Sequence, residues 1–235
     1  MQKTLTYLKL SAKAVLRQPR SIYPILKYGS KWHRYNNGKS NSVSEQIPWL
    51  CFSAISHLEK LVKPSMQVFE YGSGGSTLYW SQRVASLVSI EHDKVWGELM
   101  KKEIINKKIQ NVDFFLIEPS HDPLFNEKQF ERPGDYISAD PSYTGKNFEN
   151  YVKKIEDYPD NSFHVIIVDG RARPSCILHS MQKLEKKGYL VVDNTERKYY
   201  LKPFELEKNN WKVWHHYGPV PFTYSFSETT IFQKP

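Results

Sequence analysis

Apolar residues of this chain gather in short, nearly continuous runs, and segments with helical spacing lie between the runs. Runs of this kind are typical of buried strands in a mainly parallel sheet, because helices cover both of its faces. The alternation of strand and helix therefore predicts an α/β fold. We expect seven strands, at residues 66–71, 87–91, 112–117, 163–168, 188–194, 211–217 and 228–234.

Helices are expected between most of these strands. One should span Pro48 to Val62, with Pro48 in its first turn, and another should follow Asp93, a residue suited to N-capping. A short helix should begin at Ser76, and a longer one should cover 175–187. Residues 119–146 are polar and rich in Pro, Tyr and Asp, so we expect a long loop there. Ligands of such sheets bind beyond the carboxyl ends of the strands.

The first 44 residues differ from the rest in charge. They contain nine of the 33 Lys and Arg residues and no Asp or Glu, whereas the remainder carries 24 basic and 25 acidic residues. A nearly neutral main domain argues against a broad nucleic-acid-binding face, and we expect no nucleic-acid partner. The sequence predicts a basic N-terminal arm and linker at 1–44. It predicts one main domain at 45–235, which is long enough to form a full hydrophobic core.

No apolar run approaches the ~20 residues that cross a bilayer. The two cysteines, Cys51 and Cys176, form neither a disulfide framework nor a CxxC pair. A reducing, cytoplasmic location is the simplest interpretation.

A glycine-rich turn, "EYGSGGST" at Glu70 to Thr77, follows the first strand. A P-loop would need Lys followed by Ser or Thr after its last glycine, and a dinucleotide fingerprint would need glycine where Thr77 stands. Glu70 would oppose a pyrophosphate. The next strand ends in Glu91, 21 residues after Glu70, and an acid at that spacing can accept ribose hydroxyls. A ligand with a ribose, no phosphate and a positive centre fits these residues, and S-adenosylmethionine meets all three conditions.

With these motifs, residues 47–233 resemble the class I S-adenosylmethionine-dependent methyltransferases, above all a poorly characterised bacterial branch with stretches like "VFEYGSGGST", "SIEHD", "VDGRARPSC" and "VVDNTER". The resemblance implies a Rossmann-like sheet of seven strands, mostly parallel, with helices on both faces and the seventh strand inserted antiparallel. Glu91 would hold the ribose and His92 would lie near the adenine. The cofactor loop would comprise Glu70, Gly72, Ser73, Gly74, Gly75, Ser76 and Thr77, the serines and Thr77 holding the methionine end.

Three residues after the fourth and fifth long strands resemble the ligands of cation-dependent O-methyltransferases. Asp169, Asp193 and Asn194 would bind Mg²⁺ or another divalent cation, which lowers the pKa of the acceptor hydroxyl. Arg171 and Arg173 stand where those enzymes place a lysine. An arginine stays protonated, so this pair would bind an anionic group of the acceptor instead. The alternative is that the two aspartates only cap helices and order the loop.

Asp140 to Tyr143, "DPSY", resembles the Asp-Pro-Pro-Tyr of DNA amino-methyltransferases. That motif should end the fourth strand, but a stronger strand ends at Val168, so we interpret "DPSY" as a turn in the substrate loop. His215 and His216 lie in an expected strand and are expected to be structural.

The sequence thus predicts methyl transfer, chiefly to an oxygen of a small-molecule or glycan acceptor. A pocket of Tyr136, Tyr143, Arg171, Arg173, Arg197, Tyr199 and Tyr200 would receive it. An NAD-dependent oxidoreductase and a non-catalytic nucleoside-binding module of the same fold remain as alternatives.

The basic arm has helical spacing up to Arg17, and Pro19 and Pro24 interrupt it. Leu5, Leu8, Ala12, Val15 and Leu16 share one side of this helix, beside a stripe of Lys9, Lys13, Arg17 and Arg20. Such a helix can lie on an anionic membrane, and it also resembles an organellar transit peptide. Alternatively, its leucines pack on the domain or on a second subunit of a homo-oligomer.

Overall fold

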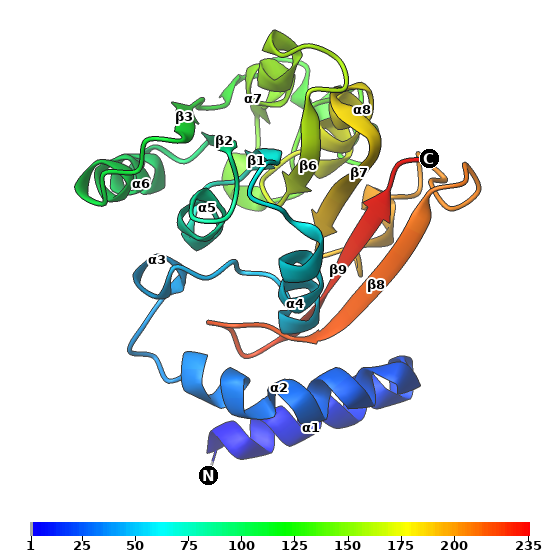
Figure 1. Cartoon of the computed structure of the whole chain (residues 1–235). Coiled ribbons are helices and arrows are strands. Elements are labelled where there is room, and N and C mark those ends of the chain that lie inside the picture. Colours follow the sequence, from blue (N-terminus) through cyan, green and yellow to red (C-terminus); the bar gives the residue numbers. More distant parts are fainter. Residues whose placement is uncertain (1) are drawn as a thin grey trace.

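A seven-stranded sheet forms the centre of the protein, whose computed structural model describes residues 2–235 (Figure 1). The strand order is β3-β2-β1-β6-β7-β9-β8; β9 runs antiparallel to both its neighbours, and the other neighbouring pairs are parallel. The predicted Rossmann-like sheet with an inserted antiparallel strand is confirmed. Its strands are β1 (Gln67–Tyr71), β2 (Ser86–Glu91), β3 (Val112–Leu116), β6 (Phe163–Val168), β7 (Leu184–Asp193), β8 (Lys212–Pro219) and β9 (Phe226–Gln233).

Alternate residues of each central strand enter two different cores, because side chains of a strand point to opposite faces. Phe69 and Ile166 pack with α7 and α8 on one face, whereas Val68 and Val165 pack with α1, α2, α4 and α5 on the other. A third cluster joins α6 to α5 and β3. The helices are α1 (Gln2–Arg17), α2 (Ile22–Tyr35), α3 (Ser42–Glu45), α4 (Phe52–Leu61), α5 (Gly75–Ser81), α6 (Lys94–Asn106), α7 (Glu149–Lys153) and α8 (Arg173–Lys183).

Two expected boundaries are wrong. Pro48 does not open a helix: Trp49 and Leu50 form a bend, Cys51 donates its N–H to Thr229 Oγ1 at 3.4 Å, and α4 begins at Phe52. The helix expected to reach Lys187 ends at Lys183, and β7 begins at the next residue. The expected long loop contains only the short strand β4 (Ser120–His121) and two 3₁₀ turns, and β4 pairs with β5 (Lys146–Asn147).

The N-terminal arm packs against the sheet as a pair of helices (Figure 1). The helix α2 was not expected, because Pro24 was interpreted as a break; a proline in the first turn is tolerated, since its missing N–H has no intrahelical partner there. Trp32 of α2 is fully buried. Asn36 Nδ2 donates to Val220 O at 3.2 Å, and Tyr224 donates to Asn36 O at 2.9 Å. These bonds tie the arm to the hairpin between β8 and β9.

The packed side of α1 is not its leucine side. Tyr7 and Ala14 are buried, and Tyr7 donates to Ile25 O at 2.6 Å. Leu5, Leu8 and Leu16 are exposed. The expectation that these leucines pack on the domain is therefore wrong, although the helix itself does pack.

Candidate functional site

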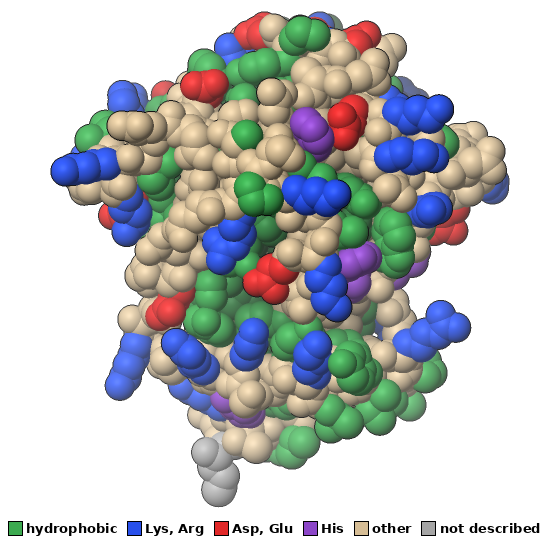
Figure 2. All heavy atoms as spheres, viewed as in Figure 1, with side chains coloured by type: hydrophobic (Ala, Val, Ile, Leu, Met, Phe, Trp, Pro, Cys, Tyr) green, Lys and Arg blue, Asp and Glu red, His purple; other side chains and the backbone are tan. Residues whose placement is uncertain are grey.

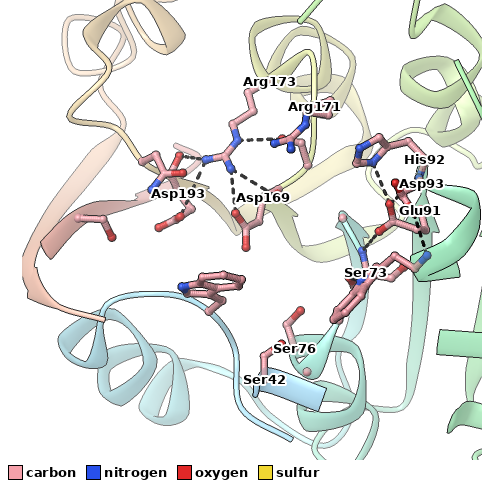
Figure 3. Close-up of a pocket in the computed structure, with 18 of the residues that line it drawn as sticks. Ser42, Ser73, Ser76, Glu91, His92, Asp93, Asp169, Arg171, Arg173 and Asp193 are labelled. Carbon is pink, nitrogen blue, oxygen red and sulfur yellow. Dashed lines mark hydrogen bonds and ion pairs between the residues drawn. The ribbon is translucent and has the colours of Figure 1, made fainter. Parts of the chain in front are cut away.

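A cavity of about 560 Å³ opens where β1, β2, β6 and β7 end (Figure 3). It brings together twelve of the fourteen predicted site residues, from the glycine loop, from the end of β2 and from the segments after β6 and β7. The two others, Glu70 and Thr77, lie beneath the loop. The predicted residues that line the cavity are Gly72, Ser73, Gly74, Gly75, Ser76, Glu91, His92, Asp169, Arg171, Arg173, Asp193 and Asn194.

The glycine loop needs small residues at two positions. Gly72 has φ +94, and a Cβ there would lie 2.9 Å from Asp169 O, so the backbones after β1 and β6 come into direct contact. A Cβ on Gly75 would lie 2.0 Å from Ser42 O. The segment that precedes α4 therefore lies directly on the loop.

Glu70 stabilises this loop from below. Its Oε2 accepts from Thr77 Oγ1 at 2.6 Å and from Ser89 Oγ at 2.9 Å, and Thr77 Oγ1 in turn accepts from Gly74 N at 3.0 Å. Burial raises the pKa of Glu70 to about 7, although hydrogen bonds oppose the shift. The expectation that Glu70 and Thr77 contact a ligand is not met in this geometry, since neither lines the cavity.

Glu91 faces the cavity from the end of β2. Its Oε2 accepts from Ser73 N at 3.0 Å, and Oε1 accepts from His92 N and Asp93 N, each at 2.8 Å. Two donors already occupy Oε1, which leaves Oε2 as the oxygen with capacity for a hydroxyl. The structure therefore suits one ribose hydroxyl at Glu91 better than the expected two.

Aromatic residues enclose one end of the cavity. His92 packs against Tyr143 and Phe148, with ring centroids 5.1 and 5.6 Å away. Trp96 lines the cavity and donates from Nε1 to Ser73 O at 2.7 Å, and Asp93 caps α6 as expected by accepting from Trp96 N at 2.8 Å. "DPSY" forms a 3₁₀ turn within the long loop, as interpreted from the sequence.

Arg173 lies between the two aspartates that were expected to bind a metal (Figure 3). Its Nη2 donates to Asp169 Oδ1 at 2.9 Å, its Nη1 donates to Asp193 O, and Nη1 is 3.9 Å from Asp193 Oδ2. Thr229 Oγ1 donates to Asp193 Oδ1 at 2.6 Å. A guanidinium therefore provides the positive charge that a divalent ion would supply.

The proposed ligand set of Asp169, Asp193 and Asn194 does not fit a divalent ion in this arrangement. Arg173 binds Asp169 Oδ1 and Thr229 binds Asp193 Oδ1, and a metal placed between the two acids would be repelled by the guanidinium. Within residues 2–235 no group of three His, Cys, Asp or Glu side chains can hold a metal. The expectation that Arg173 binds an anionic acceptor is also revised, because its donors point to these two acids and to Gly170 O, 3.0 Å from Nε.

The two aspartates keep different environments. Burial raises the pKa of Asp193 to about 6, with Arg173 opposing the shift. Burial and the nearby charge of Asp193 raise the pKa of Asp169, again against Arg173. Arg173 binds Asp169 Oδ1, whereas in the described chain no hydrogen-bond donor reaches Oδ2. Asp169 thus presents to the cavity a carboxylate oxygen that binds protons more readily than usual.

A second cavity, of about 550 Å³, adjoins the first and shares Gly170, Arg171 and Arg173 with it. Arg171 pairs with Asp140 at 2.9 Å. Arg197 donates to Tyr200 Oη at 2.8 Å, and among residues 2–235 it makes no ion pair. Of the expected acceptor residues, Tyr199 and Tyr200 line this cavity and Tyr143 lines the first. Tyr136 lines neither and instead lies 3.1 Å from His179 Nε2.

Some lining residues were not found from the sequence. Ser42 and Trp49 come from the segment before α4, and Val220, Thr223 and Ser225 come from the β8–β9 hairpin. None belongs to a recognisable motif. Contacts between distant segments, such as Ser42 O against Gly75 and the bond from Cys51 N–H to Thr229 Oγ1, bring these residues to the strand ends.

Comparisons with known proteins agree with this architecture. No protein-family model matches the chain, and a search of curated proteins finds no relative. Among solved structures, it is similar to an O-methyltransferase from Bacillus cereus in complex with S-adenosylhomocysteine, with a TM-score of 0.57, 11% identity and coverage of 97% of this chain and 100% of that one.

Two further structures are similar. One is the O-methyltransferase TomG from Streptomyces achromogenes, involved in tomaymycin synthesis and solved with S-adenosylmethionine; its TM-score is 0.56, at 12% identity, covering 87% of this chain and 98% of that one. The other is a putative O-methyltransferase from Klebsiella pneumoniae, with a TM-score of 0.54, 11% identity, and coverage of 97% and 98%. The likeness confirms the expected resemblance at the level of architecture: the chain has the class I methyltransferase fold.

Proposed function

We propose that the protein is an S-adenosylmethionine-dependent methyltransferase. The observation that carries this proposal is the cavity in which Glu91 and the Gly72–Gly75 loop meet at adjacent strand ends. Its volume of about 560 Å³ is within the usual range for small-molecule sites. Similar structures that contain the cofactor or its product support the assignment.

The residues fit the cofactor in distinct roles. Glu91 Oε2 would accept a ribose hydroxyl, and His92 and Trp96 would border the adenine. The loop from Ser73 to Ser76 would hold the methionine end. When bound, the cofactor supplies an electrophilic methyl group on a sulfonium, and the protein's part is to orient the acceptor toward it.

We assign the acceptor to the second cavity, since it opens into the first beside Arg171. Arg197, with no carboxylate partner among the described residues, favours an acceptor with an anionic group, and Tyr199 and Tyr200 favour one with a flat ring or a sugar face. A small-molecule or glycan hydroxyl satisfies both conditions. Asp169 Oδ2 is then the group that takes the hydroxyl proton, because no donor among the described residues occupies it and burial raises the pKa of this carboxyl, which strengthens it as a base.

A calorimetric titration tests the cofactor assignment. We expect micromolar binding of S-adenosylhomocysteine and none of NAD; the reverse result would favour an oxidoreductase. A screen with radiolabelled cofactor across phenols, hydroxy acids, sugar acids and phosphorylated sugars then tests the acceptor class. Cofactor binding without transfer to any acceptor would favour a non-catalytic module.

A further inference from the structure

Large apolar side chains are exposed along the outer side of the N-terminal helix pair. Leu16 is 87% exposed and Leu26 is 78% exposed, whereas most large apolar residues elsewhere are covered. We call this surface the outer apolar face. It consists of Leu5, Leu8, Leu16, Ile22, Tyr23 and Leu26.

The geometry of α1 explains why these residues stay exposed. Steps of three and four residues place Leu5, Leu8 and Leu16 on one side of the helix, opposite Tyr7 and Ala14. The opposite side packs on the protein: the ring centroid of Tyr7 lies 4.8 Å from that of Trp32, with the rings tilted, and Tyr7 donates a hydrogen bond to Ile25 O. The leucines therefore cannot turn inward without breaking this packing.

The charges carried by the helix pair itself are of one sign. All nine Lys and Arg residues of the first 44 are exposed, and this segment contains no acidic residue. Figure 2 shows a row of basic side chains across the lower part of the molecule, where Figure 1 places α1 and α2, with apolar side chains beside it. An apolar stripe flanked by flexible cations suits the boundary between lipid headgroups and acyl chains.

We propose that the outer apolar face docks the protein on an anionic lipid membrane, with the leucines in the interface and the lysines against the headgroups. A second copy of the chain fits less well, because two such faces would bring nine positive charges against nine. Insertion across the bilayer is not involved, as none of the helices in residues 2–235 is both long and apolar enough to span it.

The test uses substitutions rather than truncation, since removing the arm would uncover core residues that it packs against, among them Phe52 and Phe226. Intact protein is mixed with vesicles of phosphatidylcholine, with or without 30% phosphatidylserine, and the bound fraction is measured by flotation. We expect binding only to the anionic vesicles, weakened by 0.5 M salt. Replacing Lys3, Lys9 and Lys13 by Gln should weaken binding about a hundredfold, at about fivefold per charge.

The apolar contribution is tested by replacing Leu8, Leu16 and Leu26 with Ser, for which we expect at least a tenfold loss. Matched controls are Leu124→Ser with Leu178→Ser, and Lys101→Gln with Lys102→Gln, all exposed residues of other surfaces. Circular dichroism must show each variant folded. Equal binding by the outer-face variants and the controls, or no binding by the wild type, would overturn the proposal. So would a dimer that the leucine variant converts to monomer in sedimentation.

Discussion

Glu70 should make the protein less stable as pH rises, and Glu70→Gln should remove this loss. Its pKa is raised from 4.5 to about 7, so between these values the folded protein keeps a proton that the unfolded chain has released. The free energy of unfolding therefore falls as pH increases through this window. This difference in pKa between the folded and unfolded protein lowers the free energy of unfolding by about 3 kcal/mol once Glu70 is fully ionised. Solvent does not screen the effect, because the carboxyl is fully buried.

Glutamine cannot ionise, and its carbonyl can still accept from Thr77 and Ser89. Urea unfolding at pH 5 and pH 8 measures the effect, and the variant should gain about 2–3 kcal/mol relative to the wild type between these two values. Asp193 titrates in the same range in both proteins, so its contribution cancels in the difference. Glu98→Gln, on the exposed side of α6, should behave as the wild type. Parallel pH curves for Glu70→Gln and the wild type would refute a protonated Glu70 beneath the loop.

Four further outcomes follow from the site. Glu91→Gln should weaken binding of S-adenosylhomocysteine about tenfold or more, at about 1.5–3 kcal/mol for a charge-assisted bond; unchanged affinity in calorimetry would remove Glu91 from the site. Asp169→Asn should lower kcat about a hundredfold and abolish the acidic limb of the pH–rate profile while product affinity stays, whereas an unaltered profile would end its role as base. Activity should persist in excess EDTA because Arg173 lies between the acids; a loss that Mg²⁺ restores would reinstate the metal. Gly75→Ala should cost about 1–3 kcal/mol of stability in urea unfolding, and Gly134→Ala, with open space around it, should not; equal stabilities would contradict the close approach to Ser42.

The sequence was informative where local patterns decide structure. The mostly apolar stretch from Val68 to Tyr71 is short and leads into a glycine-rich turn, which is typical of a buried strand, so the sheet and the cofactor loop were both predictable. Asp93 as an N-cap was predictable for the same reason. The pairing of β7 with β9 followed from the family resemblance rather than from any local pattern.

Other features depend on contacts between distant residues and left no local signal. Arg173 occupies the expected metal site because its side chain points to Asp169. Arg171 has the same charge but points to Asp140, and the sequence does not distinguish the two arginines. The exposure of Leu16 could not be predicted either, because an amphipathic pattern does not show which side of a helix packs against the protein. The side of α1 that packs against the protein is the one that carries Tyr7 and Ala14.

The bond from Asn36 to Val220 joins residues 184 positions apart. During synthesis the helix pair leaves the ribosome long before the hairpin that it packs against. At about 5–20 residues per second, the interval is about 10–40 seconds. During this time Trp32 and Tyr35 lack their native ring partners in that hairpin, Tyr224 and Phe222, and the outer leucines add further apolar surface. A nascent chain of this protein should therefore be most prone to chaperone binding at its N-terminal end, and substitutions in β8 or β9 should prolong that state by delaying closure of the last contact.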